Sequence, residues 1–231
     1  MPLSPEQTTV VLLAAGHGKR MQPLTDNVPK PLLELGSHTL IEHHLLRLRD
    51  MNFRNVVINV AYLASKIKDF LGDGSNHGLD ISYSDESDTG ALETAGGIKN
   101  ALSLIQSDTF ITINADIWTR FEFTDLLTEP PEYAKLIMVE NPEHNRNGDF
   151  AIDSNGRLSN SGTKLTFSGI ASYRKTTFAA VPYGKQALAP IFRDLITKKK
   201  LEGSHYVGDW VDVGTPERLM ELRQKLQSDQ A

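Results

Sequence analysis

Glycines and cations gather in a short segment that follows an apolar run near the start of the chain. The apolar run ends at Leu13, and the chain then reads A-A-G-H-G-K-R-M-Q-P-L-T-D-N-V-P-K. Gly16 and Gly18 permit a close approach of the backbone to an anion, while Arg20 and Lys30 supply cations that suit phosphate oxygens. A lone G-x-G is common in ordinary turns, so the added cations carry the interpretation. We interpret the segment as a polyphosphate-binding turn at the carboxyl end of a strand.

Two aspartates lie in or just after apolar segments of the chain. Asp116 follows the apolar run Phe110 to Asn114, and Asp212 lies in the sequence W-V-D-V-G. The helix after Asp212 has a clear start, because Thr215 is a suitable cap and Pro216 fits the first turn. A bound polyphosphate is commonly accompanied by Mg²⁺, which takes one or two protein carboxylates together with phosphates and water. Taken alone, each aspartate would also fit an ordinary turn or helix approach.

Strand-like apolar runs alternate with helical periodicity and must position these groups. The alternation favours an α/β fold with a mixed, mostly parallel sheet and helices on both faces. No repeat or linker interrupts the chain, so we expect a single domain over residues 1–231. The predicted strands are Val10 to Leu13, Asn55 to Val60, Ile81 to Tyr83, Phe110 to Asn114, Leu136 to Val139, Phe150 to Ile152 and Leu165 to Ser172, and the predicted helices include residues 40–48, 63–71 and 188–199.

The composition excludes several classes of protein. The chain has 231 residues, 39% hydrophobic and 23% charged, with a net charge of −5. This charge argues against a non-specific binder of nucleic acid or of anionic membranes. Cysteine is absent, which excludes disulfides and thiolate zinc sites. The chain has no apolar run long enough to span a membrane and no signal-peptide pattern at its start, so we expect a cytoplasmic protein. We also expect a monomer that binds neither nucleic acid nor membrane.

In its motifs the chain resembles the sugar-1-phosphate nucleotidyltransferases, the family that makes nucleoside-diphosphate sugars. The motifs occur in the family's order over most of the chain. The residues that carry the resemblance are Gly16, Gly18, Arg20, Met21, Pro29, Lys30, Pro31, E-T-A-G-G over residues 93–97, N-A-D over residues 114–116, and W-V-D-V-G-T over residues 210–215.

The resemblance implies a Rossmann-like nucleotidyltransferase fold and a set of roles. Arg20, Lys30, Asp116 and Asp212 would be catalytic, and the two aspartates would hold Mg²⁺. The nucleotide would be bound by Ala14, Ala15, Gly16, Gly18, Lys19, Glu86 and Gly96, and the sugar by Asn114, Asn141, Asp149 and Gly169. Two alternatives stay open from the residues alone: Gly96 also fits a glycine-containing helix start, and Glu86 also fits a solvated polar loop with Asp85 and Asp88.

Segments in the second half of the chain resemble the compact branch that uridylylates N-acetylmuramate 1-phosphate in cell-wall recycling, with UTP as the nucleotide. The motif that supplies a sugar-phosphate lysine in many members is missing between Phe150 and Thr166, and Lys164 or Lys30 with Mg²⁺ would replace it. Cations near the polar loop of residues 141–147, namely His144, Arg146, Lys164 and His205, are candidates to bind the lactyl carboxylate of the sugar. Three alternatives are a pyrophosphorylase using GTP or dTTP with mannose or glucose 1-phosphate, a catalytically silent nucleotide-sugar sensor, and a Rossmann oxidoreductase. The missing third glycine of G-x-G-x-x-G disfavours the oxidoreductase.

Overall fold

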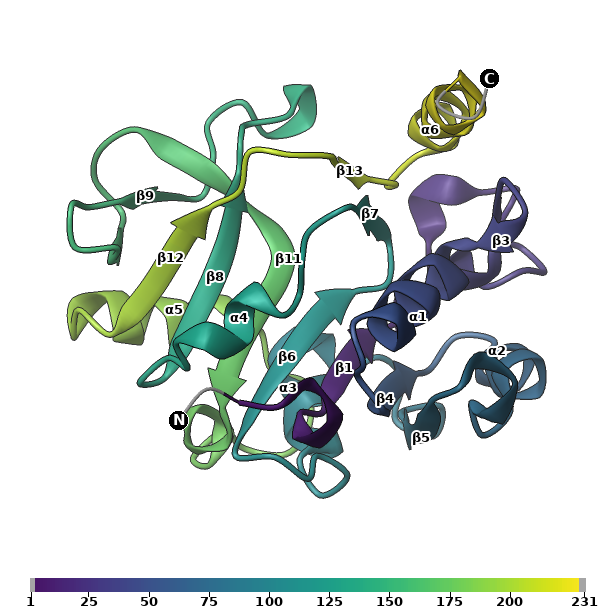
Figure 1. The fold of residues 1–231 in the computed structure, drawn as a ribbon, viewed down its shortest axis with the longest axis horizontal. Helices are drawn as coiled ribbons and strands as arrows, with labels where there is room; N and C mark the ends of the chain where they lie inside the picture. The colour runs from purple at the N-terminus through teal and green to yellow at the C-terminus, as the bar shows by residue number, and fades with distance from the viewer. Residues whose placement is uncertain (1–2, 229–231) are drawn as a thin grey trace.

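A central β-sheet organises the chain in the computed structural model, which describes residues 3–228 (Figure 1). The strands are β1 (Val10–Leu13), β2 (Glu34–Leu35), β3 (His38–Thr39), β4 (Asn55–Val60), β5 (Asp80–Asp85), β6 (Thr109–Asn114), β7 (Ile117–Thr119), β8 (Ala134–Val139), β9 (Phe150–Ile152), β10 (Leu158–Ser159), β11 (Lys164–Arg174), β12 (Leu201–His205) and β13 (Trp210–Asp212). Among the described residues the main sheet has nine strands in the order β10-β9-β11-β6-β1-β4-β5, and β8 joins β11 to β12.

Helices connect these strands. The α-helices are α1 (Leu40–Asp50), α2 (Ala64–Leu71), α3 (Glu93–Ala101), α4 (Asp125–Thr128), α5 (Ala189–Thr197) and α6 (Pro216–Ser228). Single 3₁₀ turns are η1 (Pro5–Gln7), η2 (Lys19–Met21), η3 (Lys30–Leu32), η4 (Ser75–His77), η5 (Glu143–Asn145) and η6 (Lys175–Phe178). No helix within residues 3–228 has both the length and the apolar composition needed to cross a membrane.

The central strands are parallel and buried on both faces. β1 pairs in parallel with β4 on one side and with β6 on the other. Val10 and Leu12 of β1 pack into the core that contains residues of α1 and α2, whereas Val11 faces the core that contains residues of α3 and α5. Successive side chains of a strand point to opposite faces, so the run V-V-L-L serves both cores. The predicted Rossmann-like mixed sheet with helices on both faces is confirmed.

Tertiary pairing sets the ends of several elements differently from the local pattern. The predicted strand Ile81 to Tyr83 extends over Asp80–Asp85, because each residue of β5 pairs with one of β4. The predicted helix 188–199 is shorter, at Ala189–Thr197, and the polar loop 141–147 contains the turn η5. The short ladder between β7 and β13 was not predicted at all. Such short strands carry too little periodicity to be recognised without their partner.

A small apolar cluster holds the last helix next to the turn after β1. Met21 of η2, Leu40 of α1, Trp118 of β7 and Leu219 of α6 are all buried in it. In Figure 1 the yellow segment of β13 and α6 accordingly lies beside the purple and blue segment of β3 and α1. Burial of this apolar surface holds α6 and the residues before it against η2, the start of α1 and β7.

His44 of α1 anchors the segment that follows Asp116. The ring is buried, and its Nε2 lies 2.8 Å from the carbonyl oxygen of Ile117. A carbonyl only accepts hydrogen bonds, so the ring donates one. Burial lowers the pKa of His44 to about 4, from an ordinary value of 6.5.

Acid should therefore weaken the fold through His44. Below pH 6.5 the unfolded chain binds a proton that the folded chain excludes, so this contribution to stability is present above pH 6.5 and is lost as the pH falls toward 4. We expect the free energy of unfolding to fall by up to about 3 kcal/mol over this range from His44 alone. Urea unfolding at a series of pH values would measure it, with His44→Gln as the comparison. Parallel pH profiles for the two proteins would contradict the assignment.

Candidate active site

A cavity of about 380 Å³ opens where β1 and β6 end. Its wall is built from the turn after β1, from η3, from the residues after β6 and from the start of α3. Ligands of open α/β sheets commonly bind at the carboxyl ends of the strands. The predicted residues that line the cavity are Ala14, Ala15, Gly16, Gly18, Lys19, Arg20, Lys30, Glu86, Asn114 and Asp116.

A left-handed glycine and hydrogen bonds to the carbonyl oxygen of that glycine fix the turn after β1. Gly18 has a φ of +63°, in the left-handed region that favours glycine. The hydroxyl of Thr25 donates to the Gly18 carbonyl oxygen at 2.9 Å, and the Met21 N–H donates to the same oxygen at 2.8 Å. A side chain at Gly18 would also lie 3.2 Å from the Cβ of Lys30. Arg20 is exposed at this wall, which leaves its guanidinium available to a ligand.

Lys30 is the buried cation of the site. Only 7% of the residue is exposed, and its Nζ lies 2.7 Å from Oδ2 of Asp116. Pro29 and Pro31 flank it at the start of η3, as the sequence predicted, and fix the backbone there. A charge-assisted hydrogen bond of this length is a strong one. The structure therefore joins the predicted phosphate-binding turn to a predicted metal-binding carboxylate.

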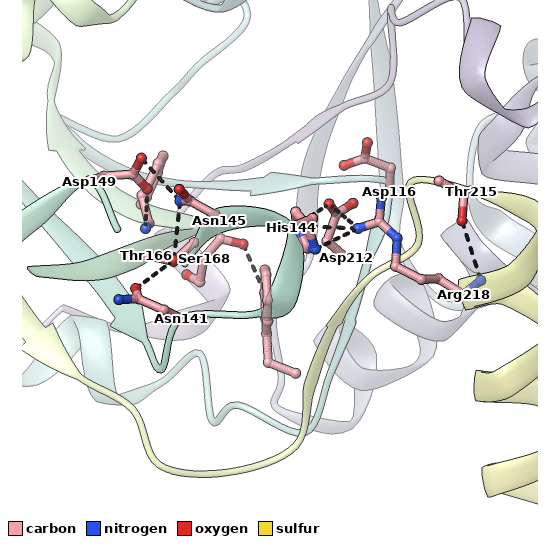
Figure 2. A network of polar contacts seen from close by, with 12 residues as sticks. Asp116, Asn141, His144, Asn145, Asp149, Thr166, Ser168, Asp212, Thr215 and Arg218 are labelled. Atoms are coloured by element: carbon pink, nitrogen blue, oxygen red, sulfur yellow. Dashed lines mark hydrogen bonds and ion pairs between the residues drawn. The ribbon is translucent and has the colours of Figure 1, made fainter. Parts of the chain in front are cut away.

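The ladder between β7 and β13 brings the two predicted metal-binding aspartates together. Asp212 is in register with Ile117, and the Val213 N–H donates to the Asp116 carbonyl oxygen at 2.9 Å. Figure 2 shows the two carboxylates near one another, with Arg218 beside them. Oδ2 of Asp212 accepts from Arg218 Nη1 at 2.6 Å and lies 3.0 Å from His144 Nε2.

The chemistry of this donor set fits Mg²⁺. Asp116 and Asp212 offer hard carboxylate oxygens, and each already holds a cation, Lys30 or Arg218. No group of three or more possible metal-binding His, Cys, Asp or Glu residues occurs in the part of the chain that the structure describes. Mg²⁺ does not require one, because it usually keeps several waters and takes further oxygens from substrate phosphates.

Glu86 is a buried brace of the cavity wall, and the alternative of a solvated loop is wrong for it. Its exposed fraction is 2%. Oε1 accepts from Asn59 Nδ2 at 2.9 Å, and Oε2 accepts from the Leu92 N–H at 2.8 Å. Asn59 in turn accepts from the Ala14 N–H at 2.7 Å. Burial raises the pKa of the Glu86 carboxyl, against the opposing effect of these hydrogen bonds.

Two of the predicted glycines lie outside the cavity wall and make room for neighbours. Gly96 lies within α3, and its N–H donates to the Gln186 carbonyl oxygen at 3.0 Å. A Cβ at Gly96 would lie 2.2 Å from the Gly184 carbonyl oxygen. Gly169 has a φ of +84°, and a Cβ there would lie 2.6 Å from Nδ2 of Asn114. Gly169 thus permits the position of Asn114, which does line the cavity.

Asn141 and Asp149 also lie outside the cavity wall and brace the loop that carries His144. The Asn141 amide donates to the Lys164 carbonyl oxygen at 2.9 Å, and its oxygen accepts from the Thr166 hydroxyl at 2.9 Å. Asp149 Oδ2 accepts from the Phe167 N–H at 2.8 Å. Figure 2 shows this network between the loop and β11. These hydrogen bonds fix the loop in which His144 lies beside Asp212.

Two of the other cations considered for the sugar, His205 and Arg146, pair with carboxylates other than Asp212. His205 Nε2 lies 3.1 Å from Oε1 of Glu140, and His205 lines a second cavity of about 290 Å³. Arg146 is exposed and lies 3.8 Å from Glu143 within its own turn. Of the four candidates, His144 is the one whose ring lies beside Asp212, with 3.0 Å between Nε2 and Oδ2.

From the sequence, Asn59 and Arg218 have no predicted role, and Glu93 and Gly214 enter only as members of the family motifs. Asn59 was visible as a polar residue in an apolar strand, N-V-V-I-N-V. Glu93 lines the cavity with a φ of +59°, unusual for a residue other than glycine. Arg218 had a weaker signal: it occupies the first turn of the capped helix that begins after Asp212, where its N–H donates to the Thr215 hydroxyl at 3.4 Å.

Comparison with known proteins defines the class to which this fold and site belong. The family model described as nucleotidyl transferase matches residues 9–229. The chain belongs to the nucleotidyl transferase family, and the prediction of a nucleotidyltransferase enzyme is confirmed.

Two relatives of the same name and one solved structure are similar to the chain. N-acetylmuramate alpha-1-phosphate uridylyltransferase of Neisseria meningitidis serogroup B is 45% identical, over 92% of this chain and 96% of the relative. The protein of the same name from Caulobacter vibrioides is 30% identical, over 94% of this chain and 96% of the relative. The crystal structure of HddC from Yersinia pseudotuberculosis has a TM-score of 0.79 at 23% identity, over 95% of this chain and 99% of that one, and supports the fold alone.

Proposed function

We propose that this enzyme transfers a uridylyl group from UTP to N-acetylmuramate α-1-phosphate, giving UDP-N-acetylmuramate and pyrophosphate, for the cytoplasmic recycling of cell-wall sugars. The observation that carries the proposal is that Arg20, Lys30 and Asp116 line one cavity at the carboxyl ends of β1 and β6, while the pairing of β13 with β7 places Asp212 beside Asp116. The similarity to two uridylyltransferases of that name, over nearly the whole chain, supports the choice of nucleotide and sugar.

The proposed reaction needs no general base. The second pKa of a phosphate monoester is about 6, so the acceptor phosphate is largely ionised at neutral pH. One of its oxygens bonds to the α-phosphorus of UTP, and the bond from that phosphorus to the pyrophosphate oxygen breaks. Catalysis then consists of positioning two anionic reactants in line and stabilising the leaving pyrophosphate.

Each charged residue of the site has a role in this proposal. Lys30, whose position is fixed by burial, would bind the α-phosphate, and Arg20 with the N–H groups of residues 16–20 would bind the β- and γ-phosphates. Mg²⁺ held by Asp116 and Asp212 would supply charge neutralisation between the reactants. Glu86 and Asn59 would keep the wall of the nucleotide cavity in place.

A matrix of substrates tests the proposal against its alternatives. Purified enzyme would receive UTP, GTP, dTTP or CTP, each with the 1-phosphates of N-acetylmuramate, N-acetylglucosamine, glucose and mannose, and released pyrophosphate would be measured. Highest efficiency with UTP and N-acetylmuramate 1-phosphate supports the proposal. A preference for GTP or dTTP with mannose or glucose 1-phosphate would replace it by another pyrophosphorylase. Nucleotide binding with no pyrophosphate in any pair would favour a sensor.

Selectivity between two sugars follows from the chemistry of the lactyl group. N-acetylmuramate differs from N-acetylglucosamine by a lactyl ether with a carboxylate, and a donor placed for that carboxylate would be left unpaired by the smaller sugar. We expect N-acetylmuramate 1-phosphate to exceed N-acetylglucosamine 1-phosphate in kcat/KM by more than about tenfold. Initial rates at subsaturating sugar would show this directly. Equal efficiencies would rule out the muramate assignment and leave a broader sugar 1-phosphate nucleotidyltransferase.

A further inference from the structure

Each carboxylate proposed to bind metal already carries its own cation. Lys30 Nζ lies 2.7 Å from Asp116 Oδ2, and Arg218 Nη1 lies 2.6 Å from Asp212 Oδ2. The two side chains of the second pair are each 19% exposed, so solvent screens this pair less than a surface pair. Together the two cations supply the same charge as one divalent ion.

A divalent ion on Asp212 would weaken its pair with Arg218. Oδ2 of Asp212 already faces both Arg218 and His144, and Arg218 Nη1 lies 3.2 Å from His144 Nδ1. A metal bound to the same carboxylate would lie within a few ångström of the guanidinium, where like charges repel. The Arg218 guanidinium would then be more stable beside a different anion.

The guanidinium lies against Gly214, which is a residue of the cavity wall. A Cβ on Gly214, which lines the cavity, would lie only 2.5 Å from Arg218 Nη2. Any side chain at this position would clash with the guanidinium, so glycine is what allows Arg218 to pack against this part of the wall. The main chain of Arg218 lies in the first turn of α6, where its N–H donates to the Thr215 hydroxyl, so we expect a change of partner to move only the side chain.

We propose that Arg218 neutralises Asp212 in the metal-free protein and binds the phosphate of the sugar 1-phosphate once a divalent ion occupies Asp212. This inference rests on the proposed function for its ligand. The guanidinium fork matches a phosphate monoester, whose two oxygens accept parallel hydrogen bonds. Metal binding thus prepares the acceptor site, because it releases the cation that the acceptor phosphate needs.

Manganese affinity tests the first half of the proposal without any substrate. Mn²⁺ binding would be measured by electron paramagnetic resonance for the wild type, Arg218→Gln and Arg223→Gln. Arg223 is a matched control on the same helix, since its guanidinium donates to the Glu34 carbonyl oxygen. We expect Arg218→Gln to bind Mn²⁺ at least about threefold more tightly, because a competitor for Asp212 is gone, and Arg223→Gln to match the wild type. Unchanged or weaker binding in Arg218→Gln would overturn the counter-ion role.

Kinetics test the second half. We expect Arg218→Gln to raise KM for the sugar phosphate about 10- to 100-fold while KM for UTP stays within about twofold, and Arg218→Lys to recover part of the loss. A purely structural role would instead change both KM values together with the melting temperature. The increase should be equal for N-acetylmuramate and N-acetylglucosamine 1-phosphates. An increase confined to N-acetylmuramate 1-phosphate would assign Arg218 to the lactyl carboxylate and overturn the phosphate role.

These experiments distinguish an error in the proposed function from an error in the proposed role of Arg218. If the wild type preferred another sugar 1-phosphate, the proposed function would be wrong, and the Arg218 variants would be measured with that preferred sugar. If the wild type used N-acetylmuramate 1-phosphate and Arg218→Gln left its KM unchanged, the proposed function would stand and the role of Arg218 would be wrong. Lys164→Ala, measured beside it, would then show whether that lysine binds the phosphate instead.

Discussion

Replacing Asp116 or Asp212 with asparagine is expected to reduce kcat by at least about 100-fold, which corresponds to about 3 kcal/mol of transition-state stabilisation. Each change removes one negative charge at nearly constant shape, so the proposed Mg²⁺ loses a hard oxygen ligand. Asp212 ends β13, Asp116 lies in the turn just before β7, with which β13 pairs, and each carboxylate is paired with a cation. Pyrophosphate release at limiting Mg²⁺ would give the rates.

Asp209→Asn is the matched control for these changes. Asp209 lies just before β13 and pairs with Lys225 on the surface of the molecule, away from the cavity lining. We expect it to keep wild-type kcat, and circular dichroism to show the same fold in all three variants. Wild-type rates in Asp116→Asn or Asp212→Asn at limiting Mg²⁺ would remove that carboxylate from the mechanism.

Replacing Lys30 with methionine is expected to cost about 2 to 4 kcal/mol of transition-state stabilisation, seen mainly in kcat. The buried ammonium is held at one position by the Asp116 carboxylate and by the prolines around it. Charge grows on the α-phosphoryl group and on the departing pyrophosphate during the reaction, so a fixed cation acts more strongly there than in the ground state. Methionine keeps most of the apolar volume of the side chain. Steady-state kinetics with varied UTP would separate kcat from KM.

Two comparisons make the Lys30 result specific. Lys198→Met removes a lysine whose partner is Asp194 on exposed α5, and we expect no kinetic change. Arg20→Ala should also lower kcat, because in the proposed reaction its guanidinium binds the β- and γ-phosphates, which leave as pyrophosphate. A rise in KM alone, with kcat unchanged, would reassign Lys30 or Arg20 to simple substrate binding.

The sequence by itself determined the fold class and the first half of the site. Runs such as V-V-L-L and F-I-T-I-N, separated by helical periodicity, specify parallel strands buried on both faces. Parallel strands end at one edge of the sheet, so residues that follow β1 and β6 must lie near one another. Lys30 and Asp116 confirm this, with 2.7 Å between Nζ and Oδ2.

The family resemblance names Asp212 and Glu86, but only the tertiary structure shows how these residues are positioned and what surrounds them. Asp212 joins Asp116 through the short antiparallel pairing of β7 with β13, and Arg218 and His144 join Asp212 because α6 and the braced loop at residues 141–149 dock there. Glu86 is buried for the same kind of reason, since Asn59 and Leu92 supply its partners. Local sequence fixes periodicity and caps, whereas these contacts depend on long-range packing, which no short segment encodes on its own.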